Sequence, residues 1–388
     1  MENNAPLHVL VISTWYPNGK DKLIGIYHKH FCHALSQNGV KVNMLHVDRQ
    51  AISMLPKYPF MKKHYTEECD GYTVYFQRML NISRISFDLQ IRSYVKHLEK
   101  LYRRYEAING KPDVLHAQVT VPAGYAACVL AKKIGVPVVV TEHCSYFERF
   151  MTGAEGKYAK YVLENAASIS CVGKYMQDIY AQKYDIHAEL LPNIVNCSAY
   201  SAPKQKANDG KLHFVTVSAL RDGKRIEFAA EALRRLKESG AIGAFDYTVV
   251  GDGYYADHYK AAVSEMGMDD CVHFVGRKTT QEIARILAGS DALLVPSDVE
   301  TFCIPAIEAL SAGVPVVSTR CGGPEGYLNA DCSELCDVDD PQDMADGIVR
   351  LVNRLDDLDE NRIRDTAKQF DAASVAEKAK SIYQSVLR

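Results

Sequence analysis

The chain has 388 residues, more than one ordinary hydrophobic core organises, and this length predicts two domains. Hydrophobic residues make up 47% of the chain and charged residues 24%, which excludes an intrinsically disordered protein. The formal net charge of −3 excludes nucleic-acid binding driven by overall charge, so we expect no nucleic-acid partner.

Cysteine usage and the absence of long apolar runs predict the compartment. The 11 cysteines are an odd number without a Cys-x-x-Cys pair, which indicates reduced thiols. The sequence shows no signal peptide and no run of 18 apolar residues, so we expect a cytoplasmic protein. Residues 57–104 are basic and aromatic, which is typical of a solvated helix face, of peripheral contact with the inner face of a membrane, or of a surface that holds an anionic acceptor.

Short apolar runs alternate with amphipathic stretches along the whole chain. Such runs, separated by helical patterns, are typical of strands buried on both faces of a parallel sheet. Helices are predicted over 123–134 and, at the end of the chain, over 374–387. We predict one set of strands at 8–13, 40–47, 114–117, 136–141 and 168–172, and a second set at 212–218, 247–250, 272–275, 292–295 and 314–318.

Two sets of strands predict an α/β fold with two doubly wound, Rossmann-like domains. The boundary falls near 191–193, because the polar stretch 198–211 that follows has no periodicity. We expect residues 1–193 and the last helix, about 374–388, to form one domain, and residues 194–373 to form the other. Ligands of parallel sheets sit beyond the carboxyl ends of the strands, so two facing sheets would enclose an interdomain cleft.

The loop after the predicted strand at 292–295 carries the strongest candidate site. Glu300 lies in this loop, and a helix is expected to begin near Pro305, because proline is tolerated in a first helical turn. Free amides at such a helix start suit a diphosphate, and Glu308, one turn in, can accept hydrogen bonds from a ribose diol. The other positions around this helix start are Thr301, Phe302, Cys303 and Ile304.

A weaker motif keeps other functional classes open. Gly251-x-Gly253-x-x-Ala256 follows a predicted strand and partly matches a dinucleotide-binding fingerprint. The expected acid downstream is replaced by Arg277, which suits a 2′-phosphate, so an NADP-dependent oxidoreductase is the main rival. That rival leaves residues 300–323 unexplained. A non-catalytic binding protein with two lobes is a third class.

The block around Glu300 resembles the Glu-x7-Glu signature of the retaining group 1 glycosyltransferases, the fourth glycosyltransferase family, which have the GT-B fold. The residues that match in order are Pro296-Ser297, Glu300, Phe302, Glu308-Ala309, Gly313-Val314-Pro315-Val316 and Gly322-Gly323-Pro324-Glu325. Five other segments resemble further motifs of the family. They are residues 14–17 together with Gly25-Ile26, Glu142-His143, Leu191-Pro192-Asn193, residues 217–224 and residues 250–253. The resemblance covers nearly the whole chain.

This resemblance implies roles for the candidate residues in catalysis. Lys224 would contact the donor diphosphate through charge-assisted hydrogen bonds, worth about 1.5–3 kcal/mol each, and stabilise the leaving nucleotide. Glu300 would bind the sugar hydroxyls and Glu308 the ribose, while His143 would point into the cleft near the donor sugar.

The resemblance also implies donor-binding positions, with two departures from the family pattern. Gly25 would let backbone approach the phosphates, Gly251 lies in a motif turn, and Arg277 falls in the base-binding loop. The family's Arg five residues before its Lys is Ala219 here, and Arg221 is the candidate replacement. The usual Gly after Phe is Cys303, which can narrow the phosphate site or tune donor choice.

The function implied is retaining transfer of a sugar from a UDP- or GDP-sugar to a hydroxyl of a glycan or lipid-linked acceptor, in surface polysaccharide synthesis. The first domain would bind the acceptor and the second the donor. We expect no cofactor, and no metal either, because Lys224 supplies the positive charge. His28, His30 and His33 could suggest a metal site, but only His30 and His33 share a helix face, so we expect these histidines to be structural. A nucleotide-sugar epimerase on the same fold is the nearest alternative enzyme.

Overall fold

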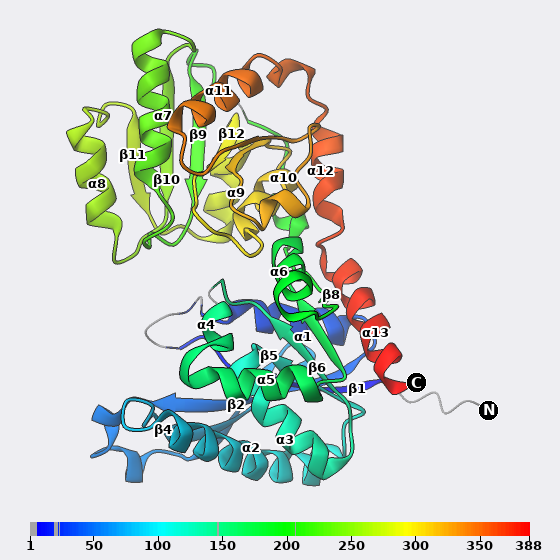
Figure 1. The fold of residues 1–388 in the computed structure, drawn as a ribbon. Helices are drawn as coiled ribbons and strands as arrows, with labels where there is room; N and C mark the ends of the chain where they lie inside the picture. The colour runs from blue at the N-terminus through cyan, green and yellow to red at the C-terminus, as the bar shows by residue number, and fades with distance from the viewer. Residues whose placement is uncertain (1–5, 19–21, 23, 146, 206) are drawn as a thin grey trace. The chain divides into compact units, whose positions relative to one another are not determined.

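A computed structural model describes residues 6–18, 22, 24–145, 147–205 and 207–388. The chain divides into two compact units (Figure 1). The first comprises Met1–Val172, Gln177–Ile194 and Ala372–Arg388, and the second comprises Gly173–Met176 and Val195–Asp371. The expected boundaries, after residue 193 and near residue 374, lie beside the crossings after Ile194 and Asp371.

The first unit is built on an eight-stranded sheet in the order β3-β4-β2-β1-β5-β6-β7-β8. β3 pairs antiparallel with β4, and the other described pairs are parallel. The strands are β1 His8–Ser13, β2 Lys41–Gln50, β3 His64–Cys69, β4 Tyr72–Leu80, β5 Val114–Gln118, β6 Val138–Glu142, β7 Ser168–Cys171 and β8 Glu189–Leu190.

Three strands of this sheet, β3, β4 and β8, lie outside the predicted set. In β4, buried Tyr72, Val74 and Phe76 alternate with less buried residues, so the strand has no continuous apolar run. β3 is a mostly polar edge strand, and β8 has only two residues. A search for apolar runs finds strands buried on both faces and misses strands of these kinds.

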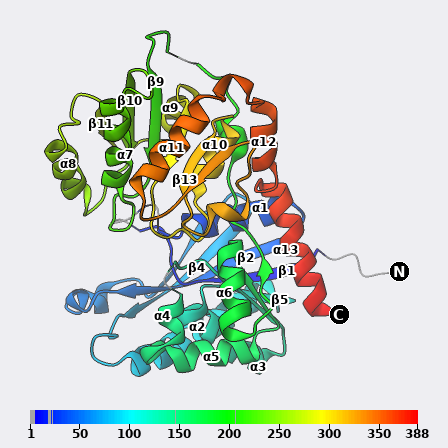
Figure 2. The same cartoon turned by 45° about the horizontal axis from the view of Figure 1, so that its top comes forward.

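The helices of the first unit include the last helix of the chain. α13 buries Val375, Ala379, Ile382 and Tyr383, which recur at helical spacing, in the core that α1 and the central strands form. α13 packs beside α1 (Figure 2). The helices are α1 Ile26–Gln37, α2 Phe87–Asn109, α3 Tyr125–Ile134, α4 Glu148–Met151, α5 Gly156–Asn165, α6 Lys174–Tyr184, which begins in the segment of the second unit, and α13 Ala372–Leu387.

The second unit is built on a parallel sheet in the order β11-β10-β9-β12-β13-β14. Its strands are β9 Leu212–Val217, β10 Phe245–Val250, β11 Val272–Gly276, β12 Ala292–Val295, β13 Val316–Thr319 and β14 Ser333–Cys336. Its helices are α7 Ile226–Ser239, α8 Ala256–Glu265, α9 Thr280–Ala288, α10 Ile304–Ser311, α11 Pro341–Val352 and α12 Glu360–Lys368.

Each sheet has a point where the strand order reverses. In the second unit, β9, β10 and β11 run outward to one side, and β12 then pairs on the other side of β9. In the first unit, β2 and β4 lie on one side of β1 and β5 lies on the other. Ligands of doubly wound sheets bind at such switch points, beyond the carboxyl ends of the strands. The loops after β1, β5, β9 and β12 are therefore the places to look for a site.

In the described part of the chain, no helix is both long and apolar enough to cross a membrane.

Candidate functional site

The candidate site of the second unit lies at its switch point. The loop after β9 carries Lys224, and the loop after β12 carries Glu300. The Lys224 ammonium forms a short ion pair with the Glu300 carboxylate, and Ser297 Oγ donates to Glu300 Oε1 at 3.0 Å. Only 19% of the Lys224 side chain and 14% of the Glu300 side chain are exposed. The structure thus brings two of the predicted residues together and adds Ser297 to them.

Contacts between loops hold these two side chains in place. Asp298 N donates to Gly223 O at 2.9 Å, and the Arg225 guanidinium pairs with the Asp298 carboxylate at 2.8 Å. Glu300 N donates to Cys321 O at 2.8 Å, which ties the same loop to the turn after β13. Arg225 and Asp298 lie 73 positions apart in the chain and outside the quoted motifs, so the sequence does not mark this pair.

The Lys224 side chain is a charged group in this site. Burial lowers its pKa, but the Glu300 carboxylate more than offsets burial, so the pKa lies above its usual value. Arg221, on the same loop, is exposed, and its positive charge lowers the pKa of Lys224, whereas the charge of Glu300 raises it. A largely buried ammonium in a rigid loop can bind a diphosphate and stabilise negative charge that develops on it.

An unusual residue precedes the helix that follows Glu300. α10 begins at Ile304, and Cys303 before it has φ 65°, a left-handed conformation that favours glycine. Burial raises the pKa of the Cys303 thiol, so the side chain stays uncharged. The Phe302 ring is buried against Tyr327 and Phe370, so the ring belongs to the core. Any contact of Phe302 with a ligand would have to come from its backbone.

Glu308 has a hydrogen-bond partner that sequence reasoning missed. Tyr200, in the 3-10 turn Cys197–Tyr200, donates to Glu308 Oε1 at 2.5 Å. Burial raises the pKa of the Glu308 carboxyl, and the bond from Tyr200 opposes this shift. Glu308 and Glu300 therefore have different partners, although the same loop and helix carry both. Tyr200 stands in a polar stretch without a motif, so no sequence signal marks it.

The remaining predicted positions of the second unit do not join the ion pair of Lys224. A Cβ at Gly251, where φ is 140°, would lie 1.8 Å from Ser218 O, so this glycine lets the loops after β9 and β10 touch. Packing therefore explains Gly251 without a dinucleotide. Arg277 is exposed after β11, the edge strand of the sheet. At the start of α10, Thr301 is buried and Ile304 is partly buried.

In the first unit, His143 follows β6 and is the centre of a polar network. Its Nε2 lies 2.6 Å from Gln118 Oε1, and its Nδ1 lies 3.1 Å from Asn193 Oδ1. Its ring stacks on Tyr27 with 4.5 Å between centroids. Burial lowers the pKa of His143 to about 3, so the imidazole is neutral at pH 7. A neutral imidazole donates one hydrogen bond and accepts one, and both of its nitrogens have partners here, so a substrate hydroxyl would bond to His143 only in place of Gln118 or Asn193.

A buried carboxylate fixes the turn that carries His143. Glu142 accepts from Thr120 N at 2.9 Å and Oγ1 at 2.7 Å, and from the amides of His143 and Cys144 at 2.8 Å each. In the sequence, Glu142 appears only within the Glu142-His143 motif, with no sign of this structural role. Gly25, with φ 68°, precedes α1, and a Cβ there would lie 2.7 Å from the Trp15 carbonyl group, so packing requires glycine.

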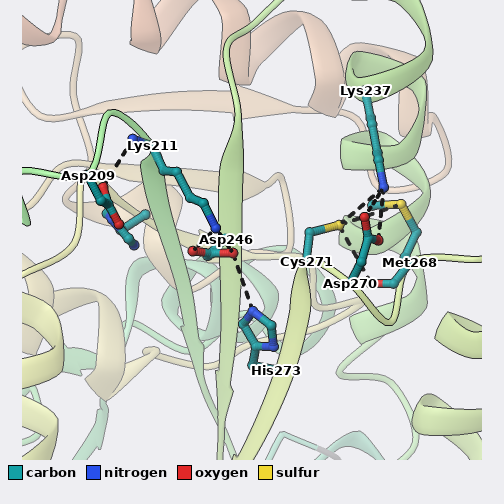
Figure 3. A network of polar contacts seen from close by, with 9 residues as sticks. Asp209, Lys211, Lys237, Asp246, Met268, Asp270, Cys271 and His273 are labelled. Carbon is teal, nitrogen blue, oxygen red and sulfur yellow. Dashed lines mark hydrogen bonds and ion pairs between the residues drawn. The ribbon is translucent and has the colours of Figure 1, made fainter.

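One group of side chains in the described residues has the spacing of a metal site. Asp209, His213 and Asp246 place their ligand atoms within 4.8 Å of one another. Lys211 already pairs with Asp246 at 3.0 Å, and His273 lies 3.3 Å from the same carboxylate (Figure 3). This cluster lies at the amino ends of β9 and β10, whereas Lys224 and Glu300 follow carboxyl ends. It is therefore an ion-pair network apart from the candidate site.

Comparison with known proteins identifies two family models. The model described as "Glycosyltransferase Family 4" matches residues 24–199, and the model described as "Glycosyl transferases group 1" matches residues 200–370. A relative, the amylovoran biosynthesis glycosyltransferase AmsK of Erwinia amylovora, is 35% identical over 147 residues, which cover 36% of each chain. The first curated relatives are matched over 35% to 66% of their own lengths.

Solved structures match over almost the entire chain. The lipopolysaccharide outer core galactosyltransferase WaaB, in its apo form, has a TM-score of 0.72 at 17% identity and covers 97% of this chain and 99% of its own. Anabaena Alr3699/HepE in complex with UDP has a TM-score of 0.70 at 14% identity and covers 98% of this chain and 100% of its own. These likenesses, with one largely parallel sheet and one fully parallel sheet, confirm the predicted GT-B class of fold with two Rossmann-like domains.

Proposed function

Because this chain belongs to the group 1 glycosyltransferases, we propose that it transfers a sugar from a nucleoside-diphosphate sugar to a hydroxyl of a glycan or lipid-linked acceptor. We propose further that the configuration at the anomeric carbon is retained. The acceptor would bind to the first unit and the donor to the second. AmsK, a relative named for amylovoran biosynthesis, supports a role in making a surface polysaccharide.

The observation that carries the proposal is the ion pair of Lys224 and Glu300 at the switch point of the second sheet. The diphosphate would replace Glu300 as the ion-pair partner of the Lys224 ammonium. The Glu300 carboxylate would then be free to accept hydrogen bonds from sugar hydroxyls. Lys224 then stabilises the charge that grows on the departing nucleotide. Because the chain supplies this cation itself, the transfer needs no metal and no cofactor.

The other site residues position the two substrates. Glu308, held by Tyr200, would bind the ribose diol, and the backbone at the start of α10 would bind a phosphate. Neutral His143 would orient a sugar hydroxyl that takes the place of Gln118 or Asn193 on its ring, while Glu142 holds the turn that carries it. The complex of HepE with UDP supports a UDP-sugar as donor, and a GDP-sugar is the second choice.

Product analysis tests this proposal. The protein is incubated with UDP- and GDP-sugars and with oligosaccharide or lipid-linked acceptors, with and without EDTA, and the product linkage is read by NMR. We expect acceptor-dependent transfer with a retained anomeric configuration and an unchanged rate in EDTA. A free epimer formed without acceptor would establish the epimerase instead, and an inverted linkage would contradict retention.

A further inference from the structure

A cavity of about 370 Å³ lies wholly within the first unit, at the switch point of its sheet. Its walls come from the loops after β1, β4 and β5, the last residues of β2, and the first two turns of α2. Parallel sheets place ligands at this edge. The residues that the argument uses are Trp15, Arg49, Arg84, Phe87, Tyr94 and Glu155.

Two of the lining side chains are cations that have no anionic partner among the described residues. Neither Arg49 nor Arg84 forms an ion pair with a residue that the structure describes, and Arg49 donates only to Thr14 O, at 3.4 Å. By contrast, Arg78, on β4, is paired with Asp48. A guanidinium group can bind a carboxylate or a phosphate through two parallel hydrogen bonds.

Other features of the cavity add to this preference for an anion. α2 begins beside it, and the amino end of a helix favours negative charge. The carboxylate of Asp88, in the first turn of α2, is turned away to Lys157 and Tyr158. Glu155 is the one acidic residue among the lining residues, so two cations face one carboxylate there.

The remaining wall is aromatic and suits a sugar ring. Trp15 and Phe87 are partly buried, and Tyr94 is fully buried. Aromatic surface with a few fixed polar groups is the usual lining of small-ligand sites. The carboxylate of Glu155 can accept hydrogen bonds from sugar hydroxyls.

We infer that this cavity binds the acceptor through an anionic group, a phosphate or a carboxylate carried on a sugar, which Arg49 and Arg84 hold while the ring lies against Trp15. The inference rests on the proposed function and specifies the substrate class of its acceptor side. A phosphorylated sugar and a uronic acid both present an anionic group to the two guanidinium groups, and the test separates these sources.

Trp15 is the single tryptophan of the chain and lines this cavity, so tryptophan fluorescence reports on ligands that bind there. Glucose 6-phosphate, glucuronate and glucose are titrated separately at constant ionic strength. We expect saturable changes of emission with one or both anionic sugars and a response to glucose at least about tenfold weaker. Whichever anion binds more tightly identifies the source of the charge.

Variants show whether the two arginines are responsible. In Arg49→Gln/Arg84→Gln the half-saturation concentration should rise at least about tenfold, while Arg92→Gln, an exposed arginine of α2 outside the lining, should leave it unchanged. Arg84→Gln alone, at an exposed position, gives an intermediate rise even if the double variant is poorly folded.

Binding of the nucleotide-sugar donor is measured in parallel, as a shift of the melting temperature. The thermal shift that a nucleotide sugar produces should persist in Arg49→Gln/Arg84→Gln. If that shift is present and Trp15 responds equally to glucose and to the anions, the acceptor inference is wrong and the proposed function stands. If no nucleotide sugar shifts the wild-type protein, the proposed function itself fails.

Discussion

At the scale of single residues, backbone crowding makes glycine necessary at position 251. A Cβ there would lie 1.8 Å from Ser218 O, whereas the same substitution at Gly240, also at positive φ, meets nothing within 4 Å. Gly251→Ala should therefore lower the free energy of unfolding by about 3 kcal/mol or more, and Gly240→Ala by about 1 kcal/mol. Urea unfolding measures both, and equal losses would contradict the close approach.

The contacts around the site show which residues sequence alone can reveal. Lys224, Glu300 and His143 follow buried strands within motifs, so they could be predicted. Tyr200 bonds Glu308 across 108 positions of the chain, and nothing local marks that pairing. Partners of this kind are decided by how the loops fold back, which periodicity and motif spacing do not encode.

At the scale of elements, α13 is joined to the first sheet by a buried hydrogen bond. Tyr383 OH lies 2.6 Å from His116 Nδ1 on β5, and both side chains are fully buried. Tyr383→Phe should cost about 1–3 kcal/mol of unfolding free energy, because the imidazole nitrogen loses its partner without access to water. Tyr254→Phe, at a residue that is 77% exposed, is the matched control and should cost less than about 0.5 kcal/mol. Equal effects would show that the bond does not stabilise α13.

The elements also differ in how readily the sequence predicts them. Strands buried on both faces, such as β1 and β12, have continuous apolar runs, and these runs coincide with the observed bounds of the strands. β4 alternates, β3 is polar, and β14 has only four residues and lies outside the predicted set. These strands are stabilised by their neighbours in the sheet, so their own residues carry a weaker signal.

At the scale of the whole molecule, a cluster of buried histidines makes stability depend on pH. Burial lowers the pKa of His46 to about 4 and those of His116 and His143 to about 3, and it places the pKa of His28 well below its usual value. Unfolded histidines take up protons near pH 6.5. Below that pH the unfolded state binds more protons, so the free energy of unfolding falls, by about 1.4 kcal/mol per pH unit for each histidine at most.

Some buried carboxyl groups act in the opposite direction. Burial raises the pKa values of Glu142, Glu227 and Glu308, so these groups contribute stability as the pH falls toward about 4.5. Between pH 6.5 and pH 5 the effect of the four histidines is larger than that of these carboxyl groups, so we expect the free energy of unfolding to fall as the pH falls. Urea unfolding at several pH values measures the slope; His116→Gln should reduce it, and His187→Gln, at an exposed position, should not. Stability that is constant or rises over this range would contradict the neutral state of the histidines.

The central claim is that Lys224 binds the diphosphate of a nucleotide sugar, and thermal stabilisation tests it most directly. Melting temperatures are measured with UDP-, GDP- and ADP-sugars and with NADP for the wild-type protein, Lys224→Ala and Lys237→Ala; Lys237 pairs with Asp270 outside the candidate site. A ligand at about a hundred times its Kd stabilises by about 2.7 kcal/mol. We predict that at least one nucleotide sugar raises the melting temperature, that Lys224→Ala loses most of this shift, and that Lys237→Ala keeps it. A shift of full size in Lys224→Ala, or a shift with NADP and with no nucleotide sugar, would contradict the account.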